Sequence, residues 1–374
     1  MSLTRRGFLS AAAVTAGATL AGVRGTTAGA NPLGSLGDLA TGSLERLDAG
    51  SGMLTPRGPL GSVGVTFPSA EQVGGTIRFA FGDGSLGDWL PLTPLDGAPD
   101  GGARNAAELV SAPQGATAFE VRAAQGTQAV VLDDGRHGGQ NYAGLRRVDF
   151  LGVPVVPRSA WGADDNASGG WAPQFFRPQC ITIHHTAMAC GPDRVGNLRS
   201  IFNYHANVLG WGDIGYHLVI DPDGVVYQGR RTALPDQPVF RVPPVLGVAP
   251  SVVTGGHTLN VNNGNVGISL LGDFTYAPPT PAAVGACIDL VRALSNAMGV
   301  HPTAGVNYVN PEFGGPVPQR FVSGHRDWGG TSCPGNAFYP QLDFIRDTAG
   351  AGFNPGFVGS AGPIVNSPLL GNVY

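Results

Sequence analysis

The sequence contains no lysine and little charge of either sign. All 22 basic residues are arginine, and charged residues make up 13% of the 374 positions, about half the share of an average globular protein. The formal net charge is −4, and no basic cluster stands out along the chain. This pattern argues against electrostatic binding of nucleic acid.

Cysteine is also scarce, because the four cysteines are too few for a disulfide scaffold. Long apolar runs are missing after the N-terminus. The uncharged stretch 242–272 is broken up by Pro, Gly and Asn, so we expect no membrane span there. Gly and Pro are abundant instead, at 59 and 31 residues, yet 42% of the chain is hydrophobic. That share is enough for a packed core, which excludes a wholly disordered chain.

The first thirty residues resemble a twin-arginine export signal. TRRGFL at 4–9 precedes an uncharged, Ala/Gly/Thr-rich stretch at 7–23, and AGA at 28–30 offers small residues for cleavage after Ala30. A membrane anchor is the alternative, but the stretch is shorter and less apolar than a stable span requires. We therefore expect a mature protein in the periplasm, in the cell wall or outside the cell, without a membrane span.

The pattern after the signal predicts two folded regions. We expect a linker at 31–55, a small all-β, sandwich-like domain at 56–135, a second linker at 136–155 and a catalytic domain at 156–349. An uncharged Gly/Pro/Asn tail follows at 350–374. The all-β prediction rests on short apolar runs bounded by Gly, Asp or Pro, without a helical period between them. These runs lie at 63–67, 76–81, 118–122 and 129–132.

From residue 157 the pattern alternates between strands and helices. We expect strands at 180–186 and 266–271, a hairpin over 216–228 and helices at 192–209, 280–299 and 336–347. Thr280-Pro281 is a typical helix start, and Gly299 a typical helix end. The prediction is an α/β domain with a mixed β-sheet flanked by helices.

Three residues of this domain could bind one metal ion. His184 ends the predicted strand 180–186, and His325 and Cys333 are eight residues apart in a Gly-rich segment. Three such ligands leave the fourth tetrahedral position open, which is typical of catalytic rather than structural zinc. The alternative is a buried, hydrogen-bonded histidine beside a free thiol.

An ordered set of motifs covers about half of the chain. The motifs are WGA at 161–163, IHHTA at 183–187, YH at 204–205, GWGDIGYH at 210–217, DGVVY at 223–227, GHT at 256–258, VGIS at 266–269 and GHRDWGGTSCPG at 324–335. This set resembles one family, the peptidoglycan recognition proteins and phage-type zinc amidases. The resemblance implies an N-acetylmuramoyl-L-alanine amidase that uses Zn²⁺ to cut the bond between the lactyl group and the peptide stem of peptidoglycan. It places the zinc ligands on His184, His325 and Cys333.

The same resemblance assigns roles around the metal. Tyr216 matches the family tyrosine beside the ion, although packing inside a sheet is its alternative. Thr331 takes the place of a lysine of the phage enzymes. A hydroxyl is a poor general acid, so we expect Thr331 to orient the intermediate while the proton travels through water. The resemblance also implies contacts with the peptide stem or the muramyl sugar at His185, Thr186, His205, His257 and Asn262.

Two departures from the family pattern stand out. QGR at 228–230 replaces the usual Glu-Gly-Arg, and an extra Pro- and Val-rich segment spans 232–254. That segment could form a lip on the substrate groove or be a surface insertion without a role.

Other functions remain as alternatives. Family members that bind peptidoglycan without cutting it have lost a ligand, most tellingly the cysteine, whereas this chain keeps all three. A Cys–His hydrolase would use Cys333 as its nucleophile, and a structural wall protein would leave the ordered His and Cys set without a purpose. We expect a monomer. A disulfide among Cys180, Cys190 and Cys287 is compatible with export, but the sequence does not choose the pair.

Overall fold

The structure is a computed structural model that describes residues 45–356, apart from 51, 96, 103–104, 133–143, 246 and 313. The predicted export signal at 1–30 lies outside the described residues, as do the start of the predicted linker at 31–44 and the end of the predicted tail at 357–374.

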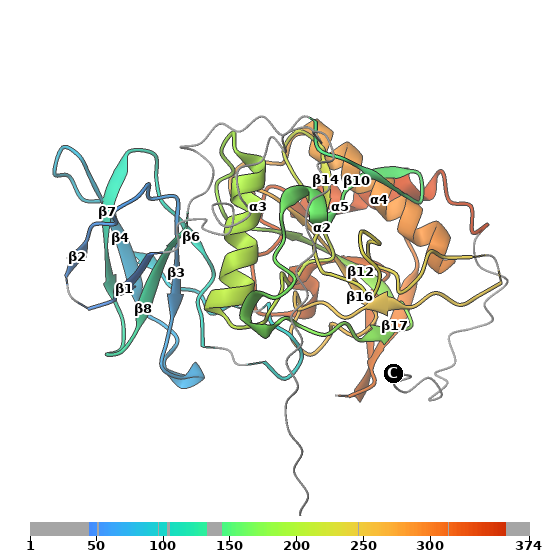
Figure 1. Ribbon diagram of the computed structural model, residues 1–374, viewed down its shortest axis with the longest axis horizontal. Coiled ribbons are helices and arrows are strands. Elements are labelled where there is room, and N and C mark those ends of the chain that lie inside the picture. The colour runs from blue at the N-terminus through green and yellow to red at the C-terminus, as the bar shows by residue number, and fades with distance from the viewer. Residues whose placement is uncertain are drawn as a thin grey trace, which may run out of the picture. The chain divides into compact units, whose positions relative to one another are not determined.

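Residues 45–132, called the N-terminal β region below, form two four-stranded sheets (Figure 1). One sheet has the strand order β1-β8-β3-β6 and the other β2-β7-β4-β5. The strands are β1 (Glu45–Asp48), β2 (Met53–Leu54), β3 (Ser62–Thr66), β4 (Thr76–Phe81), β5 (Leu90–Pro91), β6 (Val110–Ser111), β7 (Ala116–Arg122) and β8 (Gln128–Leu132), with a 3-10 turn η1 (Ala70–Gln72).

The two sheets share one apolar core. Val65 of β3 and Val131 of β8 pack with Phe79 of β4 and Phe119 of β7, and all four side chains are buried. Successive side chains of a strand point to opposite faces, so only alternate residues enter this core. β1 and β2 lie in the range 31–55 that the sequence predicts as a linker. Their alternation of apolar and polar residues is hard to recognise, because β1 has four residues, none fully buried, and β2 has only two residues.

A seven-stranded mixed sheet forms the centre of the second region, in the order β19-β12-β16-β13-β14-β10-β9. β12 runs parallel to both β16 and β19, whereas β13 and β14 form the predicted antiparallel hairpin. This is the mixed α/β sheet that the sequence predicts. The strands are β9 (Val148–Phe150), β10 (Val153–Val156), β12 (Cys180–His185), β13 (Leu218–Ile220), β14 (Val226–Gln228), β16 (Asn265–Leu270) and β19 (Val322–Gly324).

β9 and β10 lie in the range 136–155 that the sequence predicts as a linker. β10 pairs with β14 and buries Val153 and Val155 in the core. Two strands of three and four residues, the second of which contains Pro154, are too short to show the alternation of a strand.

Helices cover both faces of this sheet (Figure 1). α4 (Pro281–Met298) and α5 (Leu342–Gly350) pack against Ile181 and Ile183 of β12, and α3 (Arg194–Asn203) packs against Val219 of β13 and Tyr227 of β14. Thr280 caps α4 by accepting a hydrogen bond from the Ala283 amide at 3.1 Å, and Gly299 ends it in the left-handed conformation. Both ends agree with the sequence prediction.

Shorter elements complete the fold. The predicted helix 192–209 is α3 followed by one π-helical turn, η3 (Tyr204–Val208), a feature frequent at functional sites. No helix of the described residues is long and apolar enough to cross a membrane. The remaining elements are α2 (Arg158–Trp161), β11 (Phe175–Phe176), β15 (Val252–Val253), β17 (Gly305–Asn310), β18 (Gly314–Arg320), η2 (Ala167–Gly169), η4 (His325–Trp328) and η5 (Tyr339–Gln341).

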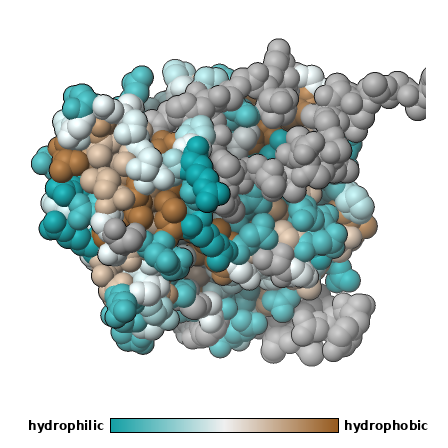
Figure 2. Space-filling model, turned by 60° about the vertical axis from the view of Figure 1, so that its left-hand side comes forward, coloured by the Kyte–Doolittle hydropathy of each residue, from teal (hydrophilic) through white to brown (hydrophobic). Residues whose placement is uncertain are grey.

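The surface of the N-terminal β region mixes apolar and polar patches (Figure 2). Met53, Leu86 and Leu90 are among its exposed apolar side chains. Inside the molecule, Cys180 and Cys287 are buried free thiols, so the structure contains no disulfide among Cys180, Cys190 and Cys287.

Candidate metal centre and active site

Two adjacent parallel strands bring the three predicted metal ligands together. His184 lies at the C-terminal end of β12, and His325 directly follows the C-terminal end of β19. Ile183 of β12 pairs with Gly324 of β19, so the residues that follow them meet at one edge of the sheet. The chain then folds back, and the Arg326 amide donates a hydrogen bond to the Cys333 carbonyl at 2.9 Å. This returns Cys333 to His325.

The potential ligand atoms of His184, His325 and Cys333 all lie within 4.8 Å of one another, and all three side chains are buried. Cys333 Sγ is 3.7 Å from His184 Nδ1. The His185 amide points at the same sulfur, 3.4 Å away, where it would stabilise a thiolate. Two imidazoles and a thiolate at this spacing are a typical zinc-binding set.

A hydrogen bond from His184 to His257 orients the His184 ring. His257 Nε2 is 3.1 Å from the Asn265 carbonyl, which can only accept, so this nitrogen carries the proton. His257 Nδ1 is therefore an acceptor, and His184 Nε2, 3.0 Å away, donates to it. The lone pair of His184 then lies on Nδ1, beside Cys333 Sγ. Such partners fix the tautomer of metal-binding histidines.

A glycine makes room for this arrangement. A Cβ atom on Gly267 of β16 would lie 2.5 Å from the His257 ring, so any other residue would displace the ring. Sequence reasoning predicts His257 as a groove residue in contact with substrate. The structure places it against His184 and the β16 backbone, where only 1% of the residue is exposed, and it also lines the small cavity beside His325 and Cys333.

Burial keeps the histidines of the site neutral. It lowers the pKa of His184 well below its usual value, and it lowers the pKa of His325 to about 3. The neighbouring histidines act in the same direction, because a second positive charge would repel the first. Neutral imidazoles are the form that binds a metal ion.

Tyr216 lies beside the ligands, as the sequence predicts. Its ring centroid is 5.4 Å from that of His184 and 5.5 Å from that of His205. Burial raises the pKa of Tyr216, and the nearby Cys333 raises it further, so the phenol stays protonated and can donate a hydrogen bond. Tyr216 also lines a small cavity of about 50 Å³ together with His325 and Cys333.

A buried ion network holds the segment that leads to Tyr216. Asp213 accepts hydrogen bonds from Arg158 at 2.9 Å and from Arg230 at 2.7 Å, and its side chain is fully buried. The guanidinium of Arg230 also stacks 4.0 Å from the Trp171 ring centroid. Asp213 is three residues before Tyr216, so these contacts fix the approach of Tyr216 to the site.

The other predicted substrate residues are bound inside the protein. His185 Nδ1 accepts a hydrogen bond from the Phe274 amide at 3.1 Å, Thr186 Oγ1 accepts one from the Gly272 amide at 3.1 Å, and His205 Nδ1 accepts one from the Gly215 amide at 3.2 Å. All three also line the cavity.

Asn262 does not point into this cavity but binds the N-terminal β region. Its side-chain amide donates to the Ala98 carbonyl at 2.8 Å and to Asp100 Oδ1 at 2.5 Å. Its own Oδ1 accepts from the amides of His257 and Thr258. Asn262 thus links the loop after β5 to the turn that carries His257.

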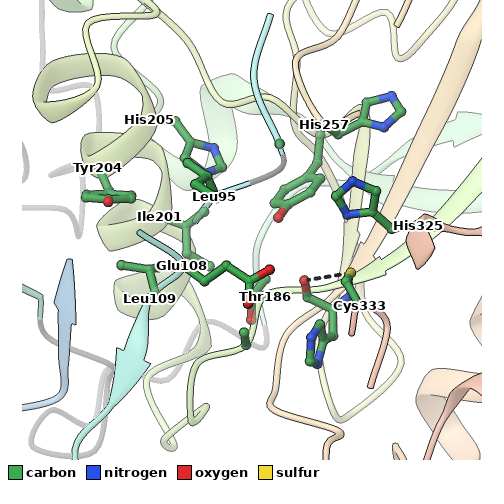
Figure 3. Close-up of a pocket in the computed structure, with 14 residues that line it drawn as sticks. Leu95, Glu108, Leu109, Thr186, Ile201, Tyr204, His205, His257, His325 and Cys333 are labelled. Carbon is green, nitrogen blue, oxygen red and sulfur yellow. Dashed lines mark hydrogen bonds between the residues drawn. The ribbon is translucent and has the colours of Figure 1, made fainter. Parts of the chain in front are cut away.

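Glu108 is a site residue that sequence reasoning misses. Thr331 Oγ1 donates a hydrogen bond to Glu108 Oε1 at 2.8 Å and accepts one from the Cys333 amide at 3.1 Å. Glu108 comes from the N-terminal β region, and it lines the cavity with Leu95 and Leu109 (Figure 3). No motif precedes or follows it in the sequence, so only the fold reveals its position.

The extra segment 232–254 does not contribute to the cavity. Among the described residues, no cavity-lining side chain comes from it. Phe240, Val252 and Val253 are instead buried in the core, and β15 pairs with β11. Gln228 fixes the start of the segment, because its Nε2 donates to the Gln237 carbonyl at 3.1 Å. The segment thus contributes buried side chains to the core, whereas Val242, Val245 and Val248 are exposed.

Comparison with known proteins identifies the second region. The family described as N-acetylmuramoyl-L-alanine amidase matches residues 174–336. Peptidoglycan-recognition protein SC2 of Drosophila simulans is 30% identical over 199 residues, which cover 51% of this chain and 86% of that protein.

Longer relatives and a solved structure match a similar share of the chain. Human N-acetylmuramoyl-L-alanine amidase is 30% identical over 206 residues, which cover 52% of this chain and 28% of that protein. The chain thus spans less than a third of this human relative. The structure of wild-type Drosophila PGRP-LB is 26% identical and covers 50% of this chain and 92% of that chain, with a TM-score of 0.37. The chain belongs to the family of N-acetylmuramoyl-L-alanine amidases and peptidoglycan-recognition proteins.

Proposed function

We propose that this protein hydrolyses the amide bond between the N-acetylmuramoyl lactyl group and the first L-alanine of the peptide stem of peptidoglycan, with the help of one Zn²⁺ ion. The single observation that carries the proposal is the buried cluster of His184, His325 and Cys333, at positions that match the amidase family. Membership of that family supports the choice of bond.

The donor set fits zinc. The tautomer that His257 imposes puts the lone pair of His184 on Nδ1, next to Cys333 Sγ, and burial keeps both histidines neutral. We infer that His184, His325 and Cys333 hold the ion. When bound, zinc in such a site polarises the substrate carbonyl and lowers the pKa of a water to about 7.

The chain's own residues would do the rest. The Tyr216 hydroxyl would donate a hydrogen bond to the oxygen that gains negative charge as the amide is attacked. The Thr331 hydroxyl lies two residues from Cys333, where it would orient the same intermediate. His185, Thr186 and His205 line the cavity wall, and their internal hydrogen bonds would hold that wall rigid around the substrate. Asn262 would act through His257 rather than on the substrate.

Mass analysis of digested peptidoglycan tests this function. We expect intact peptide stems with a new free alanine amine, and intact glycan strands. Shortened glycans or cut stems would overturn the choice of bond, and binding without any product would support the non-catalytic alternative. A zinc chelator should abolish cleavage, whereas a Cys–His hydrolase with Cys333 as nucleophile would keep its activity.

We further propose that the protein is exported by the twin-arginine route and acts as a monomer in the periplasm, in the cell wall or outside the cell. The support is the TRRGFL motif at 4–9 and the AGA site at 28–30. Mass determination of the exported protein should give a chain that starts at Asn31. An exported chain that still carries Arg5 and Arg6 would contradict the cleavage.

A further inference from the structure

The proposed reaction needs a group that protonates the leaving amine, and Thr331 does not supply one. Its hydroxyl hydrogen is directed at Glu108 Oε1, 2.8 Å away, and its oxygen accepts from the Cys333 amide. Aliphatic hydroxyls are weak acids in any case, whereas carboxylates are common proton carriers in enzymes. The hydrogen bond thus points from Thr331 to a better candidate.

Glu108 is held in place by its own backbone. Its amide donates to the Thr93 carbonyl at 2.8 Å, and the preceding amide, of Ala107, donates to the Val65 carbonyl of β3 at 2.9 Å. β6 begins two residues later and pairs with β3. A side chain on such a support loses little freedom when it is positioned for catalysis.

The N-terminal β region is itself packed onto the amidase region. Val130 and Leu132 of β8 share a buried core with Ile201 and Tyr204. A Cβ atom on Gly64 of β3 would lie 2.4 Å from the Tyr204 ring, so this ring packs directly against the backbone of β3. This contact keeps Glu108 at a fixed place relative to the metal ligands.

The Glu108 side chain faces the site. It lines the same cavity as Tyr216, His325 and Cys333, and Figure 3 shows its carboxylate directed toward the side of the cavity where His325 and Cys333 lie. Glu108 lies outside the residues that match the amidase family, 174–336.

We propose that Glu108 is a catalytic residue of this amidase, supplied by the N-terminal β region. The inference rests on the proposed function. As the water oxygen bonds to the lactyl carbonyl carbon, one of its protons moves to a carboxylate oxygen of Glu108. That proton then moves to the alanine nitrogen as the carbon–nitrogen bond breaks, so the amine leaves neutral and Glu108 is regenerated. The second water proton remains on the new carboxylic acid, which ionises to solvent.

Leaving-group chemistry separates this role from a structural one. The substrate is a synthetic N-acetylmuramoyl tripeptide, and its analogue carries L-lactate in place of the first alanine, so that an ester replaces the amide. An alkoxide leaves without prior protonation far more readily than an amine anion. Glu108→Gln should therefore lower turnover on the amide by about 10²-fold or more, the range of general acid–base catalysis. It should lower turnover on the ester by a clearly smaller factor, because the ester loses only the acceptor of the water proton.

Matched variants complete the experiment. Glu71→Gln removes a fully exposed carboxylate of the same region and should leave both rates unchanged. Glu108→Gln should keep the zinc content and the melting temperature of the wild type, and sodium formate should restore part of the amide cleavage in Glu108→Ala.

The possible failures are distinguishable. Equal losses on amide and ester, or a full amide rate in Glu108→Gln, would overturn the role of Glu108 alone. Wild-type protein that cleaves neither substrate would overturn the proposed function, and this inference with it.

Discussion

The Tyr216 hydroxyl can be tested without disturbing the packing of its ring. The half-buried ring packs against His184 and His205, so Tyr216→Phe removes only the donor. We expect the variant to bind zinc as the wild type does and to lose turnover by about 10²-fold or more, which is typical of one missing oxyanion donor. Turnover numbers and elemental analysis check this. A wild-type rate would show that the hydroxyl has no catalytic part.

His257 should matter for metal affinity, because it orients the ring of His184. His257→Phe keeps a ring in the space beside Gly267 but removes the acceptor of His184 Nε2, 3.0 Å away. Losing such a partner typically costs about 10- to 100-fold in metal affinity. Competition titration with a zinc chelator measures this affinity.

The matched control for His257 is His301→Phe, which changes a histidine that packs on Phe353 at 5.1 Å, away from the ligand cluster. The control should bind zinc like the wild type. A wild-type zinc affinity in His257→Phe would refute the orienting role.

The sequence predicts individual residues only where a motif carries them. His184, His325 and Cys333 stand in ordered motifs, and the structure brings their potential ligand atoms within 4.8 Å of one another. The position of Glu108 could not be predicted, because its contact with Thr331 joins residues 223 positions apart. The contact between His257 and His184 could not be predicted either, because it depends on the space that Gly267 of β16 leaves for the His257 ring.

At the scale of elements, the segment before Tyr216 depends on one buried carboxylate. Asp213→Asn would leave Arg158 and Arg230 without their shared counter-charge in a buried place. Breaking a buried ion pair typically costs about 3–5 kcal/mol, so we expect a loss of this order in the free energy of unfolding. Urea denaturation of both proteins measures the difference.

An exposed ion pair on the same region provides the comparison. Asp223 pairs with Arg194 at 3.1 Å, but its side chain is 67% exposed. Asp223→Asn should change the free energy of unfolding by less than about 1 kcal/mol, as is usual for surface pairs. Similar effects of the two substitutions would argue against a special role of the Asp213 network.

Elements with clear end signals were predictable, and those whose length or geometry is set by packing were not. Thr280-Pro281 and Gly299 mark the ends of α4, and the structure has both caps in place. The π-helical turn after α3 has no such signal. It arises where Tyr204 packs against β3, and a contact between regions so far apart in sequence leaves no local pattern.

At the scale of the whole molecule, the two regions pack against each other. The sequence separates the chain into a β-rich and an α/β part, and the structure has both kinds of sheet. Composition cannot reveal the close packing between them. Val130 and Leu132 of the β region share an apolar core with α3, and Asp100 accepts a hydrogen bond from Asn262. Local patterns report which face of an element is apolar, but not which distant element covers it.

Buried neutral histidines should make the whole fold sensitive to acid. Burial lowers the pKa of His205 to about 3 and that of His217 to about 4, whereas both titrate near about 6.5 in an unfolded chain. Between these values the unfolded state binds protons that the native state does not. Stability is therefore complete above about pH 6.5 and falls as the pH drops toward 4, by up to about 1.4 kcal/mol per pH unit for each histidine.

The metal-free protein allows this linkage to be measured without the effect of zinc. Urea unfolding at pH 7.5, 6.5 and 5.5 should give a falling free energy of unfolding. This upper part of the window is the cleanest, since burial raises the pKa of Asp100 and Asp221 and their protonation in the native state opposes the trend at lower pH. His217→Gln removes one titrating group. The variant should be less stable at pH 7.5, because the Gly267 amide and the Val253 carbonyl lose their hydrogen bonds to His217. Its free energy of unfolding should also depend less steeply on pH. A slope equal to that of the wild type would mean that His217 does not remain neutral in the folded protein.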